Sequence, residues 1–125
     1  MMLLDTNIVI EFWKQNSLVV GHVATLAQTG LYVSDVCVYE LLVGARDGQD
    51  MRFIQSNLKN LLALPINESI SQNETLLLAL FSLSHRLSLP DALIAATALH
   101  HGLPLYTLNR KDFRYIPDLQ LYEPA

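Results

Sequence analysis

The chain has 125 residues, 51% hydrophobic and 16% charged, so it is long and apolar enough to bury the core of one compact domain. Twelve acidic residues against eight Lys and Arg give a net charge of −4, the wrong sign for binding nucleic acid by charge alone. Cys37 is the single cysteine, which excludes an internal disulfide and a C-x-x-C metal site, and its apolar neighbours predict a small core residue.

The first predicted element is a strand over residues 1–4, which runs directly into Asp5, Thr6 and Asn7. An all-apolar run suits a strand that is buried on both faces in the middle of a parallel sheet. Ligands bind at the carboxyl edge of such sheets, so Asp5 is a candidate metal ligand or catalytic base. This segment alone equally allows Asp5 to be the cap of the following helix.

Strands alternate with helices along the rest of the chain. The predicted helices span residues 7–14, 18–28, 35–46, 51–61, 67–86 and 92–101, with a turn at 47–50, and the predicted strands span 31–33, 62–66, 103–108 and 119–122. This alternation predicts an α/β fold with a central parallel sheet of about four to five short strands flanked by helices. We expect one domain over residues 1–125.

Glu40 occupies an unfavourable place for a carboxylate. The helix over residues 35–46 is expected to turn Val36, Tyr39, Leu42 and Val43 inward, and Glu40 lies on or beside that face. A carboxylate there is costly unless it is paired or bound to a metal ion. The alternative is a glutamate at the edge of the face that extends into water.

Two further acids follow buried segments near the C-terminus. Asp91 comes after Pro90 at the expected start of the helix over residues 92–101, where an acid also suits the positive end of the helix. Asp112 follows the last long apolar strand, which repeats the pattern of the N-terminus. Because strand ends and following helix starts share one edge of an α/β sheet, Asp5, Asp91 and Asp112 can converge, and Glu40 can join them. Clustered carboxylates imply a hard cation, Mg²⁺ or Mn²⁺.

The longest apolar stretches, Leu76 to Leu83 and Ala92 to Leu99, fall short of the roughly 18 residues that a membrane span needs. The N-terminal run has no basic region before it and is interrupted by Asp5, unlike a signal peptide. We therefore expect a cytoplasmic protein without membrane attachment. Residues 76–81 are apolar all round their helix, which predicts either full burial or a subunit interface.

Four blocks of the chain, in order and in register, resemble the PIN-domain ribonucleases and more closely the VapC-type toxins of bacterial toxin–antitoxin pairs. The blocks are Leu4-Asp5-Thr6-Asn7, Glu40-Leu41-Leu42-Val43-Gly44-Ala45, Pro90-Asp91-Ala92-Leu93-Ile94-Ala95-Ala96-Thr97-Ala98 and Thr107-Leu108-Asn109-Arg110-Lys111-Asp112-Phe113. The resemblance spans essentially the whole chain. It implies a metal-dependent endoribonuclease toxin, usually a homodimer, that is neutralised by a cognate antitoxin.

The resemblance also implies roles for particular residues. The matching acids are the catalytic and metal-binding set, and the matching polar residues support them: Asp5, Glu40, Asp91 and Asp112 in the first group, and Thr6, Asn7, Thr107 and Asn109 in the second. Catalysis would rest on Mg²⁺ or Mn²⁺, which lowers the pKa of a bound water that attacks phosphorus. Arg110, Lys111 and Arg114 beside Asp112 are candidate ligands of RNA phosphates, or else a solvated basic loop.

Two other functions fit parts of the same pattern. One is a catalytically silent metal-binding α/β module with a regulatory or protein-interaction role. The other is a phosphoaspartyl phosphatase with a nucleophilic first-strand aspartate, but that class needs a second aspartate two positions on, where this chain has Asn7.

Exposed apolar surface is expected near Phe53 and Ile54 and on the helix over residues 69–86. We expect this surface to bind a second copy of the chain and a peptide of the antitoxin. An Arg or Lys of the antitoxin is expected to reach the acidic residues.

Overall fold

The computed structural model describes residues 1–124 and contains one parallel sheet of four short strands. The strands lie in the order β3-β2-β1-β4, so the N-terminal strand is internal. Their bounds are Met2–Leu4 for β1, Leu31–Ser34 for β2, Leu62–Leu64 for β3 and Leu105–Tyr106 for β4. The predicted α/β class and the parallel sheet are confirmed.

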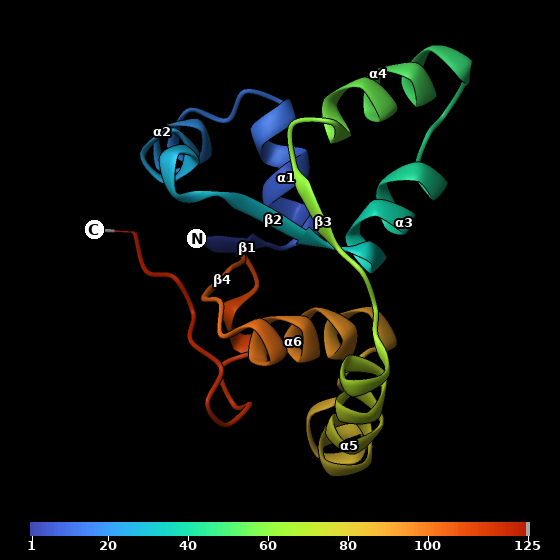
Figure 1. Cartoon of the computed structure of the whole chain (residues 1–125), viewed down its shortest axis with the longest axis vertical. Coiled ribbons are helices and arrows are strands. Elements are labelled where there is room, and N and C mark those ends of the chain that lie inside the picture. The colour runs from blue at the N-terminus through green and yellow to red at the C-terminus, as the bar shows by residue number, and fades with distance from the viewer. Residues whose placement is uncertain (125) are drawn as a thin grey trace.

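In the described part of the chain, six α-helices flank the sheet. Their bounds are Thr6–Trp13 for α1, Ser17–Leu26 for α2, Asp35–Val43 for α3, Gly48–Leu58 for α4, Glu68–His85 for α5 and Leu89–His101 for α6, with short 3₁₀ turns η1 at Ala27–Thr29 and η2 at Arg110–Asp112. Figure 1 shows α1 and α2 on one side of the sheet and α5 and α6 on the other. Within residues 1–124, no helix is both long and apolar enough to cross a bilayer.

Alternation along β1 divides the core into two clusters. Leu3 faces the cluster formed with α5 and α6, whereas Met2 and Leu4 face the cluster formed with α1 and α2. All three side chains are buried, as predicted for a strand covered on both faces. The same alternation directs the next residue, Asp5, toward the α6 side of the sheet.

Polar residues cap the starts of the helices, and α4 and α6 each begin three residues earlier than predicted. Asp47 caps α4 by accepting the N–H of Asp50 at 2.8 Å, so the helix begins inside the expected turn at 47–50. Ser88 caps α6 by accepting the N–H of Asp91 at 3.2 Å, so Asp91 lies in the first turn and is not the cap. Pro90 is tolerated there because its missing N–H has no partner in a first turn anyway.

Several predicted element ends and faces are wrong. β3 stops before Pro65, which has no N–H to donate to a sheet, and residues 119–122 contribute only one parallel bridge, between Leu121 and Leu105. Tyr39 and Val43 of α3 are exposed. The helix turns its other apolar positions inward because it packs against β2 and α6 on that side: Val36, Cys37 and Leu41.

Candidate active site

Four carboxylates reach the carboxyl edge of the sheet from four different elements. Asp5 ends β1, Glu40 lies in α3, Asp91 lies in the first turn of α6, and Asp112 ends η2, which follows β4. The backbone of Asp5 continues the sheet beyond β1 by donating its N–H to the carbonyl oxygen of Tyr106 at 2.9 Å. A rigid strand end therefore carries the central acid.

Asp5 is the most firmly held of the four acids. Its side chain is buried, and its Oδ1 accepts the N–H of Thr6 at 2.8 Å while its Oδ2 accepts the hydroxyl of Thr107 at 2.7 Å. The Thr107 hydroxyl oxygen in turn accepts the N–H of Asn109 at 3.0 Å. This chain of neutral donors fixes both carboxylate oxygens without supplying a positive charge.

Thr6 connects the second acid to the first. Its backbone N–H binds Asp5, and its hydroxyl donates to Oε1 of Glu40 at 2.7 Å. Glu40 itself is exposed. The side chain of Asn7 supports the same region by accepting the N–H of Leu108 at 3.3 Å, which ties the start of α1 to the end of β4.

The pKa values of Asp5 and Asp91 are raised by burial and by the charges of neighbouring acids. Burial raises the pKa of Asp5 above its ordinary value of 3.8 against the hydrogen bonds from Thr107 and Thr6, and the charges of Glu40 and Asp112 raise it further. Burial also raises the pKa of Asp91, to about 6, and the negative charges of Asp5 and Asp112 add to the shift. The neighbouring negative charges therefore oppose the ionisation of Asp5 and of Asp91.

The donor set suits a hard divalent cation. All four groups are carboxylates, and of the two ion pairs found in residues 1–124, Arg46–Asp50 and Arg110–Glu123, neither involves them. A buried carboxylate such as Asp5 without a basic partner is costly unless a cation compensates it. In the described part of the chain, no three His, Cys, Asp or Glu side chains are arranged so that they could hold a metal ion together.

The basic residues beside Asp112 differ from one another. Arg110 donates to the carbonyl oxygen of Tyr122 at 3.0 Å and to Oε1 of Glu123 at 2.6 Å, so its guanidinium is already engaged by the C-terminal segment. Sequence reasoning missed this pair because its partners lie 12 and 13 residues further along the chain. Lys111 and Arg114 are exposed and stay candidates for phosphate binding.

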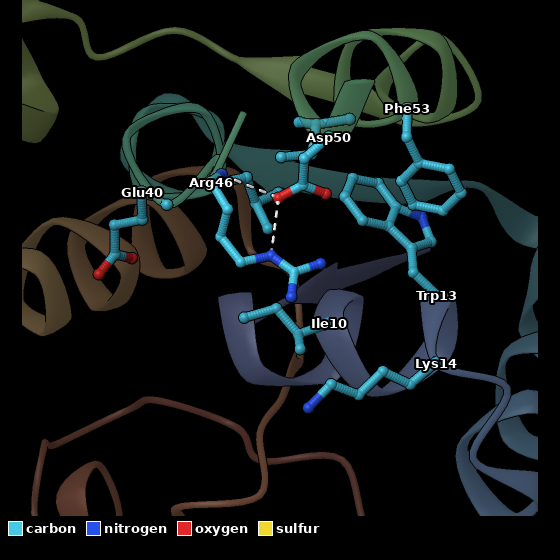
Figure 2. A pocket seen from close by; sticks show the side chains of 10 residues that line it. Ile10, Trp13, Lys14, Glu40, Arg46, Asp50 and Phe53 are labelled. Carbon is cyan, nitrogen blue, oxygen red and sulfur yellow. Dashed lines mark hydrogen bonds and ion pairs between the residues drawn. The ribbon is translucent and has the colours of Figure 1, made fainter. Parts of the chain in front are cut away.

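An apolar groove opens beside Glu40, in the region near Phe53 and Ile54 where apolar surface was expected. It encloses about 380 Å³ between α1, α3 and α4, and its walls include Ile10, Trp13 and Phe53. Figure 2 shows Trp13 against Phe53, whose rings meet edge to face at 5.9 Å, with Glu40 at the other end of the groove. Apolar walls that end at a carboxylate suit a ligand with an apolar body and a cationic tip.

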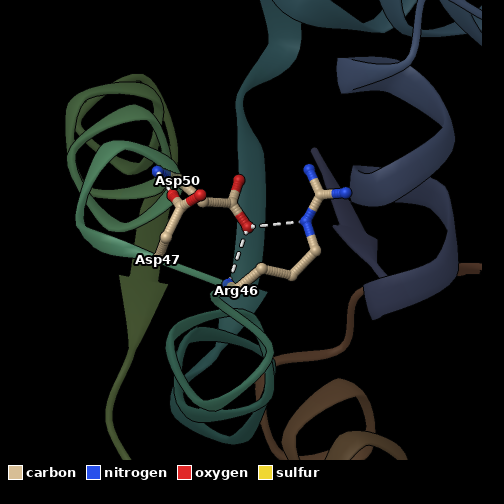
Figure 3. A network of polar contacts seen from close by, with 3 residues as sticks. All are labelled: Arg46, Asp47 and Asp50. Carbon is tan, nitrogen blue, oxygen red and sulfur yellow. Dashed lines mark hydrogen bonds and ion pairs between the residues drawn. The ribbon is translucent and has the colours of Figure 1, made fainter.

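One ion pair spans the connection from α3 to α4 in this groove. The Oδ2 of Asp50 accepts the backbone N–H of Arg46 at 3.0 Å and its Nε at 3.4 Å (Figure 3). The Arg46 side chain is 87% exposed, so the pair contributes little to stability. Its guanidinium extends toward Ile10 (Figure 2), and Arg46 pairs with Asp50 and not with Glu40.

A four-stranded parallel α/β sheet with carboxylates gathered at its carboxyl edge defines the class of protein: a compact α/β domain built around an acidic site. The family described as PIN domain matches residues 2–119, and the chain belongs to this family. It is 30% identical to the protein named Ribonuclease VapC from Rickettsia bellii (strain RML369-C), over 96% of this chain and 93% of that one.

Solved structures of other proteins resemble this chain over nearly its whole length. A toxin–antitoxin complex from Klebsiella pneumoniae contains a chain with 28% identity and a TM-score of 0.77, covering 99% of this chain and 100% of that chain. VapBC-1 from nontypeable Haemophilus influenzae contains one with 27% identity and a TM-score of 0.82, covering 98% and 96%. The resemblance read from the sequence is therefore confirmed as family membership.

Proposed function

We propose that this protein is a divalent-metal-dependent endoribonuclease toxin, neutralised by a cognate antitoxin. The observation that carries the proposal is Asp5, a buried carboxylate that Thr107 and Thr6 hold at a strand end, within electrostatic reach of Glu40, Asp91 and Asp112. The chain around it is similar over 96% of its length to a protein named as a ribonuclease. We assign the whole of residues 1–125 to this one nuclease domain.

Asp5, Glu40, Asp91 and Asp112 are the proposed ligands of Mg²⁺ or Mn²⁺. Such an ion, when bound, polarises a phosphate oxygen and lowers the pKa of a coordinated water. The protein's own contribution is to hold the acids: Thr107 orients Oδ2 of Asp5, Thr6 links Asp5 to Glu40, and Asn109 fixes Thr107 through its backbone N–H. Lys111 and Arg114 are the proposed contacts for the phosphates of the RNA strand.

The proposed antitoxin contact is the groove between α1, α3 and α4. Its apolar walls suit a short amphipathic segment, and Glu40 at its end suits an Arg or Lys of that segment. Several of the solved structures similar to this chain are toxin–antitoxin complexes, including VapBC-1 from Haemophilus influenzae. A basic side chain placed among the acids would supply the positive charge that the ion supplies during catalysis.

A homodimer is the proposed assembly, and the cytoplasm the proposed location. The outer face of α5 carries Leu76, Leu80 and Leu83, which are 55%, 58% and 98% exposed. Their spacing of four and three residues places them on one stripe of the helix. Contiguous exposed apolar side chains of this kind mark protein contacts, and a second copy of the same helix fits such a stripe.

RNA cleavage by the purified protein tests the proposal against a catalytically silent module. Wild type, Asp5→Asn and the control Asp118→Asn, an exposed acid outside the site, are incubated with total RNA in Mg²⁺ or Mn²⁺, and new 5′ ends are mapped. We expect the same new ends from wild type and Asp118→Asn and none from folded Asp5→Asn. Equal cleavage by Asp5→Asn would refute the proposed site, and no cleavage by wild type with ion bound would favour the silent module.

A further inference from the structure

Tyr115 follows Asp112 by three residues, and its ring is held by the C-terminal part of α5. It stacks on His85 with the ring centroids 3.9 Å apart and the planes at 15°, and it meets Phe81 edge to face at 5.1 Å. His85 is itself fixed, because its Nδ1 lies 2.8 Å from the hydroxyl of Ser84. Two aromatic contacts from one helix therefore set the direction of the phenol.

The Tyr115 hydroxyl is buried without a hydrogen-bond partner. No other buried side-chain nitrogen or oxygen atom in residues 1–124 shares this condition. Buried polar groups in native proteins are almost always paired, and an exception points to strain, a catalytic role or a ligand absent from the coordinates. The aromatic contacts explain where the ring lies, but they do not explain why this position carries an oxygen atom.

The surroundings of the hydroxyl are acidic. Burial raises the pKa of the Tyr115 phenol, and the negative charges of Asp91 and Asp112 raise it further, so both carboxylates lie within electrostatic reach. A phenol O–H is a hydrogen-bond donor, and ionised carboxylates accept only. The phenol donates to neither carboxylate in this structure, although the charge of each acts on it.

We propose that Tyr115 is a positioning residue of the acidic site, whose hydroxyl donates a hydrogen bond to the Asp91 carboxylate when a divalent ion is bound. Tyr115 then does for Asp91 what Thr107 does for Asp5, whose Oδ2 accepts the threonine hydroxyl at 2.7 Å. Carboxylates that bind metals are commonly held by such an outer hydrogen bond, which fixes their orientation. The inference rests on the proposed metal-dependent function, and it adds a residue that none of the four matching sequence blocks contains.

The test is Tyr115→Phe in the full-length protein, because this change removes one oxygen and keeps the stacked ring. Mn²⁺ affinity is measured by isothermal titration calorimetry, and melting in chelator is followed by circular dichroism. Tyr32→Phe is the matched control, since its hydroxyl contacts only Met1 Sδ, at 3.7 Å. We expect Tyr115→Phe to bind Mn²⁺ roughly tenfold more weakly or worse and the control to bind like wild type. Neither variant should melt below wild type in chelator, because removal of the unpaired Tyr115 hydroxyl takes no hydrogen bond from the fold.

Two results would overturn the inference. One is Mn²⁺ affinity in Tyr115→Phe equal to that of wild type, and the other is a marked loss of stability in chelator, which would assign the hydroxyl to the fold. Asp5→Asn separates this failure from failure of the proposed function. If Asp5→Asn abolishes Mn²⁺ binding while Tyr115→Phe leaves it intact, only the role of Tyr115 falls. If Asp5→Asn also binds normally, the acidic metal site itself is wrong.

Discussion

Asp5 performs two tasks with one carboxylate. Its Oδ1 caps α1 by accepting the N–H of Thr6, so the alternative that Asp5 is the cap of the following helix is correct. Its Oδ2 accepts the hydroxyl of Thr107, which comes from the end of the neighbouring strand and has no role in the cap. A simple helix cap needs no such second partner and no further acids nearby. The cap and the proposed metal site are therefore compatible uses of the same group.

Asp91 offers a measurable link between charge and stability. Its pKa in the folded protein is raised to about 6 from an ordinary value of 3.8. The folded state therefore holds the proton more tightly than the unfolded state. The resulting stabilisation is complete below pH 4 and is lost as the pH rises through about 6, where the folded group ionises against burial and its acidic neighbours.

We predict that Asp91→Asn in chelator is more stable than wild type at pH 7, because asparagine carries no charge to be opposed. The gain is on the order of 1 kcal/mol after allowance for solvent screening of a half-exposed group, and it shrinks toward zero near pH 4. Chemical denaturation of both proteins across this range measures it. Ser88, not Asp91, caps α6, so the cap survives the substitution. A variant less stable than wild type at pH 7 would contradict the proposed repulsion.

At the scale of elements, the burial of α5 differs from what its apolar composition suggests. Its centre is apolar on all sides, which allowed either full burial or an interface. The structure buries Leu77 against α6 and leaves Leu76, Leu80 and Leu83 in solvent, so full burial is excluded. Helix α5 packs against α6, and no other helix or strand of residues 1–124 covers its outer side (Figure 1). The interface interpretation therefore remains, as the proposed homodimer contact.

We predict that Leu80→Lys converts a dimer into a monomer. The side chain is 58% exposed in the single chain, so the change leaves the fold of the protomer intact while placing a charge within the apolar stripe. Light scattering at micromolar concentration measures the mass. Ser82→Lys is the control, since Ser82 is exposed on the same helix but lies about 200° around the axis from Leu80. A wild-type monomer, or a dimer that survives Leu80→Lys, would dismiss this stripe as the contact.

At the scale of the whole molecule, the charge is unevenly distributed. Four of the twelve acids converge on one edge of the sheet, and the remaining eight are balanced by eight Lys and Arg. The net charge of −4 is thus the charge of the proposed site. An overall acidic protein can still act on RNA if a divalent cation neutralises this edge and exposed bases such as Lys111 and Arg114 meet the phosphates.

We predict that Mg²⁺ raises the melting temperature of wild type in proportion to the logarithm of its concentration above the dissociation constant, as expected for a ligand that binds only the folded state. NaCl at matched ionic strength controls for general screening and should have a much smaller effect. Asp5→Asn should lose most of the Mg²⁺ response. The same shift with NaCl as with Mg²⁺ would show that screening alone relieves the repulsion, without a specific ion site.

Local patterns in the sequence determined the class of fold and the list of acids. Residues 1–4 predict a doubly covered strand because every side chain is apolar, and the abrupt change to Asp5 marks where it ends. Turn and cap residues predict the start of a helix to within a few positions. Where two residues suit the same helix start, the folded structure decides which of them is the cap. Both Ser88 and Asp91 suit the start of α6, and the hydrogen bond between them selects Ser88 as the cap.

Only the tertiary structure decided which groups meet across long distances in the chain. It paired Thr107 with Asp5 across 102 residues and Thr6 with Glu40 across 34, because neighbouring parallel strands bring their ends together. It also paired Arg110 with Glu123 and buried the Tyr115 hydroxyl without a hydrogen-bond partner. Periodicity and composition describe one segment at a time, whereas hydrogen bonds and burial depend on how separate segments pack.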